Sequence, residues 1–430
     1  VLFRSYYKSS GPDLLIFVFQ IIVDFLFARK IEKEEGSSRQ IWATTAVLFS
    51  LSFLLYFKYP NFILENTNWL LLTHFEPVDL FLPIGISFYT FQSISYVVDV
   101  YRGEIRSSRS FLDYAFYMTF FPHLVAGPIV RAKDFLGQIN SPENLDARRY
   151  KESLFRIVTG LIKKLLIADY LGKYVDMVFQ NPTFYSGGEN LLGALSYSFQ
   201  IYFDFSGYSD IAIGLALLVG YRLKENFENP YGASNVTEFW RKWHISLSTW
   251  LRDYVYIPMG GNRKGTFNTY LFLLITMLVG GFWHGASWQF VCWGAAHGLA
   301  LALHKAVHKY LPDGQWMNFI GGIFTFSFVT FCWIFFRASN FDTALLILNQ
   351  MAVATSEADF IGFWFSRNEL AILLMALLSW TIIPGNWKAK LFEWTFYVPS
   401  FFWFFILLAA LQLIIQFRDT LVQPFIYFQF

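Results

Sequence analysis

Apolar residues in this chain gather into long runs, and short polar, glycine- and proline-containing stretches separate them. A helix that crosses a bilayer needs about 20 mostly apolar residues. The pattern therefore predicts roughly ten membrane-associated segments, at residues 14–28, 41–57, 80–100, 111–130, 154–179, 191–221, 270–283, 286–304, 319–336, 370–383 and 398–417. Pro122, Gly127 and Pro128 interrupt the fourth run, so we expect that segment to enter the membrane and return.

The composition agrees with a multi-pass membrane protein. Of the 430 residues, 55% are hydrophobic and 15% are charged, and the mean hydropathy is +0.40. A soluble domain carries about 25% charged residues, so this chain has too few charges to cover a soluble globule. No linker and no repeat of fixed period divides it. We predict one all-α, polytopic integral membrane domain over residues 1–430.

Basic residues predict the topology of this domain. Lysine and arginine concentrate at residues 29–39, 102–109, 131–156, 222–264, 304–309 and 388–390. The positive-inside rule places such loops in the cytosol. The acidic stretch 65–79 and the loop 338–369 then face the other side. The net charge of +2 says little about partners, but the sequence contains no arginine-rich arm or RNA-type motif, so we expect no nucleic-acid partner.

The start of the chain and its cysteines carry less information. The chain begins at Val1 without methionine or a signal peptide. We expect a fragment that lacks its natural first helix, and it stays open whether residues 1–5 are native, because VLFRS matches one reading frame of a common sequencing adapter. Cys292 and Cys332 lie in apolar segments, and we expect free thiols.

Two histidines that each follow a tryptophan, His244 and His284, are the strongest chemical signals. An imidazole is costly to bury without a partner, an ionisable residue inside a membrane segment is a functional candidate, and histidine transfers protons near neutral pH. The alternatives are a core histidine at His284 and an interfacial, membrane-anchoring helix around His244. The basic residues near His244 could also receive the phosphates of a nucleotide-like donor.

Three further histidines carry weaker signals. His297 would not share a face of one straight helix with His284, but a bend at Gly285 could bring the two together, so we expect it to be structural or to support His284. His304 and His308 have the i, i+4 spacing of a zinc pair, but no glutamate of an HExxH motif or third ligand accompanies them. A solvated helix end is the better interpretation, and we predict no metal site.

Asp204 and Asp210 lie in the stretch YFDFSGYSDIAIG. A spacing of six places them on different faces of a helix, which argues against a catalytic carboxylate pair. We expect each of them to pair with a basic residue or to cap a break near Gly207.

Five stretches resemble one known family. They are FLPIGISFYTFQSISYVVDVYRG (residues 81–103), FFPHLVAGPIVR (120–131), QIYFDFSGYSDIAIGLALLVGY (200–221), NFENPYGASNVTEFWRKWHISLSTWLRDYVYIPMGGNRKG (226–265) and FWHGASWQFVCWGAAHG (282–298). In this order and over residues 80–304, they resemble the membrane-bound O-acyltransferase superfamily. Within it, the chain is most similar to the bacterial branch that contains the membrane subunit of alginate O-acetyltransferases.

The resemblance implies helices around a tunnel that crosses the bilayer. It makes His284 the essential histidine and His244 the second catalytic position. We place His297, Trp283, Trp243 and Asp210 around them as supporting residues. His123 occupies a position in FFPHLVAGPIVR that we treat as variable and not catalytic.

The same resemblance implies a function. An acetyl group would pass from a cytosolic thioester donor, acetyl-CoA, across the bacterial inner membrane to an exopolysaccharide or cell-wall polymer. The donor would be a substrate rather than a tightly bound cofactor, and a periplasmic or membrane-anchored acetyltransferase would be the partner. We also expect the lipid bilayer to contact the protein's apolar surface.

Two alternatives stay open. One is D-alanyl transfer to teichoic acid from a carrier-protein thioester, although the loop GGNRKG at residues 260–265 favours acetylation. The other, from a different class, is a proton-coupled transporter. Transporters often contain inverted repeats, and none is visible in this sequence.

Overall fold

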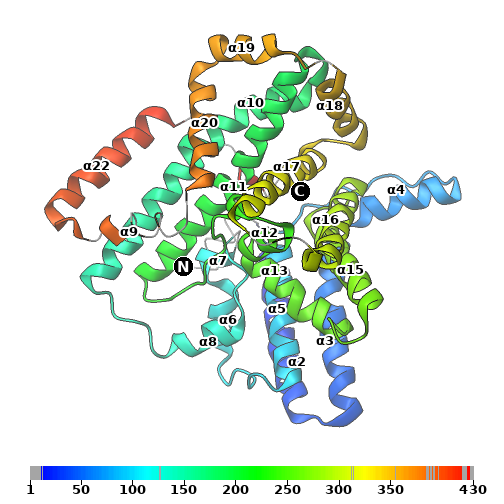
Figure 1. The fold of residues 1–430 in the computed structure, drawn as a ribbon. Helices are drawn as coiled ribbons and strands as arrows, with labels where there is room; N and C mark the ends of the chain where they lie inside the picture. The colour runs from blue at the N-terminus through cyan, green and yellow to red at the C-terminus, as the bar shows by residue number, and fades with distance from the viewer. Residues whose placement is uncertain are drawn as a thin grey trace. The chain divides into compact units, whose positions relative to one another are not determined.

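The computed structural model describes residues 11, 13–124, 127–310, 312, 314–353, 355–383, 387, 390, 393–395, 397–418 and 424–426. Every regular element among them is a helix (Figure 1), so the predicted all-α class is confirmed. The residues group into two compact units, Val1–Ser153 with Ala212–Lys224, and Leu154–Ile211 with Glu225–Phe430. That the chain acts as one integral domain stays a prediction, and residues 1–5 lie outside the described part.

The first unit is built around a bundle of three helices. These are α2 (Asp13–Lys33), α3 (Gly36–Lys58) and α5 (Ile86–Arg102), which pack against one another (Figure 1, blue to cyan). Their contact surface holds a polar group: Ser50 of α3 donates a hydrogen bond to the Asp24 carboxylate of α2, at 3.3 Å, and Ser93 of α5 donates to the same carboxylate. A buried carboxylate needs such donors, so this cluster fixes the register of the bundle.

The acidic stretch 65–79 contains more structure than a loop. Helix α4 (Pro60–Leu71) covers its first part, and none of its residues is buried. Two of its asparagines bind the extended segment that follows. Asn61 pairs with both backbone groups of Val78, and Asn68 does the same with Phe75. These four hydrogen bonds hold the extended segment against α4.

The predicted interruption of residues 111–130 is confirmed. Helix α6 (Phe111–Thr119) ends before a single turn, α7 (Phe121–Leu124), and residues 127–131 have no regular structure. Helix α8 (Ala132–Ile139) follows. Residues 125 and 126 of the motif lie outside the described part, and re-entry into the membrane stays a prediction.

Charge pairs join two helices at the start of the second unit. Its first elements are the end of α9 (Ala147–Leu161), the π-helical segment η1 (Ile162–Ala168), α10 (Asp169–Gln180) and α11 (Gly187–Leu218). Lys163 lies 2.5 Å from Asp210, and Lys164 lies 2.5 Å from Asp204. The expectation that both aspartates pair with basic residues is confirmed. Helix α11 continues through Gly207 without a break.

The middle of this unit holds both tryptophan–histidine motifs. Its elements are α12 (Val236–Lys242), α13 (Ile245–Leu251), the π-helical turn η4 (Arg252–Tyr256), α14 (Ile257–Met259), α15 (Thr266–His284), α16 (Trp288–Val307) and α17 (Gln315–Arg337). Helices α15 and α16 pack as a tight hairpin (Figure 1). A Cβ atom on Gly281 would lie 2.2 Å from the Phe290 carbonyl oxygen, and one on Gly294 would lie 2.4 Å from that of Met277. Only glycine permits this approach.

The segment 338–369 was expected to be a loop, and this is wrong. It folds into α18 (Phe341–Val353) and α19 (Glu357–Ser366) because each helix has an N-terminal cap. Asn340 accepts a hydrogen bond from the Thr343 amide at the start of α18, and Ser356 forms a capping box with Asp359 at the start of α19. Helix α19 continues into α20 (Asn368–Ile382) through a bend of 110°.

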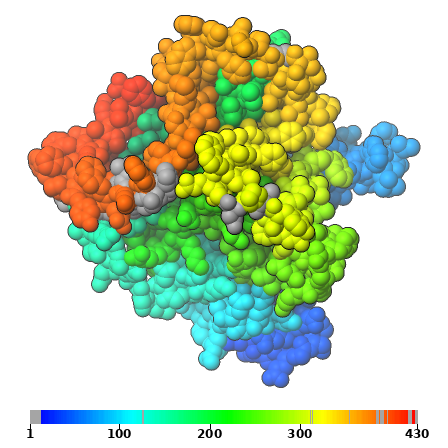
Figure 2. Space-filling view, in the orientation of Figure 1, coloured from blue at the N-terminus to red at the C-terminus, as the bar shows by residue number. Residues whose placement is uncertain are grey.

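Five described helices are long and apolar enough to cross a membrane: α3, α11, α15, α16 with its last turn η5 (His308–Tyr310), and α17. The bent pair α19–α20 raises the number to six. The predicted number of about ten is not confirmed, because several apolar runs form shorter helices. One of them is α22 (Ser400–Phe417), which lies at the surface (Figure 2, orange-red). Several of its phenylalanines are exposed.

Candidate active site

His284 is the last residue of α15 and is 4% exposed. The chain turns at Gly285 in an extended conformation and begins α16 three residues later. Aromatic rings surround the imidazole, with centroids 5.0 Å away for Trp283, 5.1 Å for Trp293 and 5.2 Å for Phe336. The predicted break after His284 is thus the turn between two helices of a hairpin. It holds the imidazole in an apolar cage.

His297 is brought to His284 across this hairpin. It lies on α16, is fully buried, and its ring centroid is 4.8 Å from that of Trp293, the ring that also contacts His284. The indole N–H of Trp240 on α12 donates to Nδ1 of His297 at 3.2 Å. The two histidines therefore share one aromatic wall, as the sequence suggested, although on two helices instead of one bent helix.

His244 links α12 to α13 in an unusual backbone conformation. Its φ of 40° and ψ of 57° are left-handed, which non-glycine residues rarely adopt. Its ring is fully buried and packs edge-on against Phe205, 4.6 Å between centroids. The Trp283 ring lies 6.3 Å away, so Trp283 stands between the two motif histidines. Burial lowers the pKa of His244 to about 3, so the ring is neutral at physiological pH.

Asn226 is the polar partner of His244. Its Oδ1 lies 3.1 Å from Nδ1 of His244 and also accepts the amide and hydroxyl of Ser246, at 3.2 and 2.8 Å. Its Nδ2 donates to Ser209 at 3.3 Å. Asn226 is 1% exposed, so these bonds replace all its contact with water.

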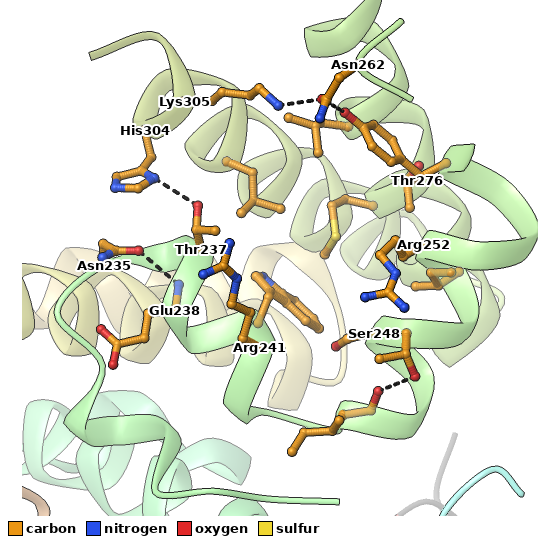
Figure 3. A pocket seen from close by; sticks show the side chains of 18 of the residues that line it. Asn235, Thr237, Glu238, Arg241, Ser248, Arg252, Asn262, Thr276, His304 and Lys305 are labelled. Carbon is orange, nitrogen blue, oxygen red and sulfur yellow. Dashed lines mark hydrogen bonds between the residues drawn. The ribbon is translucent and has the colours of Figure 1, made fainter. Parts of the chain in front are cut away.

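A cavity of about 1060 Å³ opens beside these residues (Figure 3). Elements from α12 to η4, the loop at Asn262, and the helices α15 and α16 line it. Trp240 and Met277 form part of its apolar wall. Met277 precedes His284 by seven residues on α15, about 10 Å of helix rise. Trp240 contacts Trp293, at 5.7 Å between centroids, so one layer of indoles separates the cavity from the cage of His284.

The cavity is rich in cations. Arg241 and Arg252 direct their guanidinium groups into it (Figure 3), and Lys305 reaches its rim, where it donates to Asn262 at 2.6 Å. Arg241 forms no hydrogen bond or ion pair within the described residues. The lining acid, Glu238, is already bound by Lys242 at 2.7 Å. Arg252 is paired with Asp253 at 2.7 Å, which leaves Arg241 and Lys305 as the lining cations without a carboxylate partner among the described residues. Two such cations facing one cavity suit an anionic ligand.

His304 also lines this cavity, which the interpretation as a solvated helix end did not anticipate. Its Nδ1 lies 2.8 Å from the Thr237 hydroxyl, and the exposed His308 follows one turn later. In the part of the chain that the structure describes, no three histidine, cysteine, aspartate or glutamate side chains converge as metal ligands.

The remaining expected residues take different places. Trp283 is the ring between the histidines, while Trp243 is buried in a neighbouring cluster with Trp333, 5.1 Å between centroids. Asp210 binds Lys163 and has Arg156 at 3.7 Å, and none of its described contacts is with a histidine. His123 is buried in the first unit, where its Nε2 bonds the Tyr117 carbonyl at 2.9 Å.

Sequence reasoning missed Asn226 and the cavity residues Arg241, Arg252 and Lys305. The excess of basic residues between 222 and 264 was a faint signal for the cavity. It could not show that three cations from separate elements face one space. For Asn226, the one available signal was its place at the start of the same motif that ends in GGNRKG.

Comparisons with known proteins give the family context. The sequence profile of the MBOAT, membrane-bound O-acyltransferase family, matches residues 41–341. A Pseudomonas putida protein named "Probable alginate O-acetylase AlgI" is 48% identical over 319 residues, covering 73% of this chain and 64% of that protein. The chain thus spans less than two thirds of that relative's length.

Two other relatives have different acceptors in their names. A Helicobacter pylori "Peptidoglycan O-acetyltransferase" is 38% identical over 372 residues, covering 79% of this chain and 70% of that protein. A Bacillus subtilis "Teichoic acid D-alanyltransferase" is 28% identical over 287 residues, covering 62% of this chain and 72% of that protein. The profile covers more than half of the chain, and the histidine motifs lie inside it. The chain belongs to the membrane-bound O-acyltransferase family.

Proposed function

We propose that this protein moves an acetyl group from a cytosolic thioester, acetyl-CoA, across the membrane to an acceptor hydroxyl, for O-acetylation of an exopolysaccharide or cell-wall polymer, with His284 as the general base. The observation that carries the proposal is the position of His284. It is buried in an aromatic cage at a helix turn, one layer of indoles away from a cation-lined cavity. Family membership and relatives named for O-acetylation of alginate and peptidoglycan support this activity over a transporter.

The chemistry follows from the residue types. The imidazole of His284 accepts the proton of the acceptor hydroxyl as that oxygen attacks the thioester carbonyl carbon. The carbon–sulfur bond breaks, an ester forms, and the departing thiolate takes up the proton. The apolar cage excludes water, which would otherwise hydrolyse the donor. His244, neutral and one ring away, serves as the second catalytic histidine.

The cavity is the proposed site for the donor's phosphates. Arg241, Arg252 and Lys305 provide charge-assisted hydrogen bonds to phosphate oxygens. The cavity borders the basic region 222–264, for which the positive-inside rule predicts a cytosolic position. The thioester end of the donor would pass Trp240 to reach His284.

The experiment is acetyl transfer by the protein in liposomes, with radiolabelled acetyl-CoA, either alginate or peptidoglycan as the acceptor, and a membrane extract that supplies the partner enzyme proposed below. His284→Ala should lower the rate by about 10²–10⁴-fold at equal membrane-inserted amounts. His74→Ala, an exposed histidine of the first unit, is the matched control and should keep the rate. A wild-type rate in His284→Ala would refute the assignment.

We also propose that a separate periplasmic or membrane-anchored enzyme of the bacterial inner membrane places the acetyl group on the polymer. Stable domains usually need about 50 residues or more, and the segment 338–369 forms only two short helices. Trp364 and Phe365 of α19 are exposed there, 40% and 80%, which suits docking better than binding a sugar. Full-rate acetylation of polymer by this chain alone, and unchanged acetylation in cells lacking the partner gene, would contradict this relay.

A further inference from the structure

The first turn of α13 has an unusual cap. A helix N-terminus leaves backbone amides without partners, and the N-cap side chain usually accepts one of them. His244 is the N-cap residue here, and its side chain makes no such bond. Asn226, eighteen residues earlier in the chain, satisfies these amides instead. Its backbone oxygen accepts the Ile245 amide at 2.9 Å, and its Oδ1 accepts the Ser246 amide at 3.2 Å.

This arrangement identifies the oxygen of the Asn226 side chain. A backbone N–H can only donate, so the atom facing the Ser246 amide must be the amide oxygen. The same oxygen faces Nδ1 of His244 at 3.1 Å. The Ser246 hydroxyl donates to that oxygen too, so its Oγ, 3.4 Å from Nδ1, can offer His244 only a lone pair. Asn226 Oδ1 and Ser246 Oγ therefore both face Nδ1 as acceptors.

An imidazole nitrogen that faces acceptors must carry the proton. We propose that Asn226 is a positioning residue, which holds His244 in the tautomer with its proton on Nδ1 and thereby leaves the lone pair of the neutral ring on Nε2. The inference rests on the proposed catalytic role of His244. It assigns the proton-accepting atom of that histidine and a residue that selects it.

The rest of the surroundings agrees with this assignment. Phe205 and Phe227 pack against the His244 ring at 4.6 and 6.4 Å between centroids and offer no proton acceptor in the ring plane. Ser209 binds the other end of the Asn226 amide, so the side chain cannot rotate its oxygen away without losing three hydrogen bonds at once. Asn226 does not line the cavity, so its effect on the reaction passes through His244.

The first test uses Asn226→Ala in the liposome assay. Alanine keeps the backbone oxygen that binds Ile245 but removes Oδ1. We expect kcat to fall by about 10²-fold, as for loss of an acid–base contribution, with the KM for acetyl-CoA unchanged. Asn190→Ala is the matched control. Asn190 is another fully buried asparagine that bonds three turn carbonyls, far in sequence from both histidines, and its loss should lower stability without changing kcat.

Asn226→Asp separates positioning from structure. Its carboxylate retains the acceptor for the Nδ1 proton, so activity should return to within about tenfold of the wild type. The added negative charge favours the imidazolium and raises the pKa of His244. The acid limb of the pH–rate profile should therefore move to higher pH. A purely structural asparagine would give the alanine and aspartate variants the same kcat and profile per folded molecule, which would overturn the inference.

A double-mutant cycle distinguishes this inference from the proposed function. In a His244→Ala background, Asn226→Ala should cause no further loss, because it acts through the missing ring. Wild-type activity of His244→Ala alone would refute the role of His244. A low rate in that variant, combined with a fully additive effect of Asn226→Ala, would refute only the positioning role.

A measurement on the wild type keeps the inference testable if the alanine variant does not fold. Nitrogen NMR of ¹⁵N-histidine-labelled protein, compared with His244→Ala, isolates the His244 signals. We expect the neutral ring with a protonated Nδ1. A protonated Nε2 would overturn the inference.

Discussion

Trp240 of α12 donates its indole N–H to Nδ1 of His297 on α16 over 3.2 Å, and both residues are buried. The bond fixes the indole between the cavity and the cage of His284. Trp240→Phe should leave His297 unpaired and lower the free energy of unfolding by about 1–3 kcal/mol. The pair Trp240→Phe, His297→Phe should cost less than the sum of the single changes, since neither polar group then remains. The measurement is denaturation of the detergent-solubilised protein. A loss of unfolding free energy in the double variant equal to the sum of the two single losses would contradict this coupling. Trp316→Phe, at an exposed tryptophan, is the control.

The cavity cations should affect donor binding more than the chemical step. Arg241→Gln and Lys305→Gln each remove a charge from the lining. We expect the KM for acetyl-CoA to rise about tenfold or more, the value of one charge-assisted hydrogen bond, with kcat within about twofold. Lys309→Gln removes a charge from the same helix end outside the lining and should change neither constant. A lower kcat at unchanged KM would place the donor elsewhere.

The basic loops should be inaccessible from outside the cell. A cysteine at Arg263, which is exposed, should resist an impermeant thiol reagent applied to intact cells, whereas one at Glu65 should react. The exposed native Cys292 must first be replaced by serine, while Cys332 is buried. Labelling of position 263 from outside would make a cytosolic entrance to the cavity untenable.

The protein should lose stability in mild acid through His123. Burial lowers the pKa of this histidine from 6.5 to about 4, although its bond to the Tyr117 carbonyl opposes the change. Between pH 6.5 and 4 the unfolded chain binds more protons than the folded one, so this part of the stability is complete above pH 6.5 and is lost as the pH falls toward 4. The loss approaches roughly 3 kcal/mol at 1.36 kcal/mol per pH unit. In His123→Gln, the melting temperature should depend less on pH between 6.5 and 4 than in the wild type. The same pH dependence in both proteins would contradict the assignment.

Much of the helical pattern could be predicted because apolar periodicity is a local property. The runs at 41–57 and 270–283 became α3 and α15 with ends shifted by a few residues. The prediction of a loop at 338–369 was wrong because caps at Asn340 and Ser356 start helices there. The apolar stretches of this segment are short and interrupted by polar residues, so they did not indicate helices. The span count differed because length alone cannot distinguish a crossing helix from α10 or α22.

The site was predictable in its histidines and not in its partners. Two tryptophan–histidine pairs are visible in the sequence, and glycines flank the one at His284, so His284 and His244 stood out. The bond from Trp240 to His297 joins residues 57 positions apart, and the bonds of Asn226 to Ser209, His244 and Ser246 span 17 to 20 positions. Such pairings depend on how α12, α13 and α16 pack, which periodicity does not encode.

The left-handed backbone of His244 makes selection for stability and selection for activity favour different residues at position 244. An L-residue with a positive φ costs about 1–2 kcal/mol relative to an ordinary conformation, and asparagine tolerates it better than most residues. In a library of variants retained only for abundance in the membrane, position 244 should drift toward asparagine or glycine. In a library retained for acetylation, histidine should persist there despite its conformational cost. The difference between the two populations at position 244 would show how much folding free energy the protein gives up to keep a histidine there for the reaction.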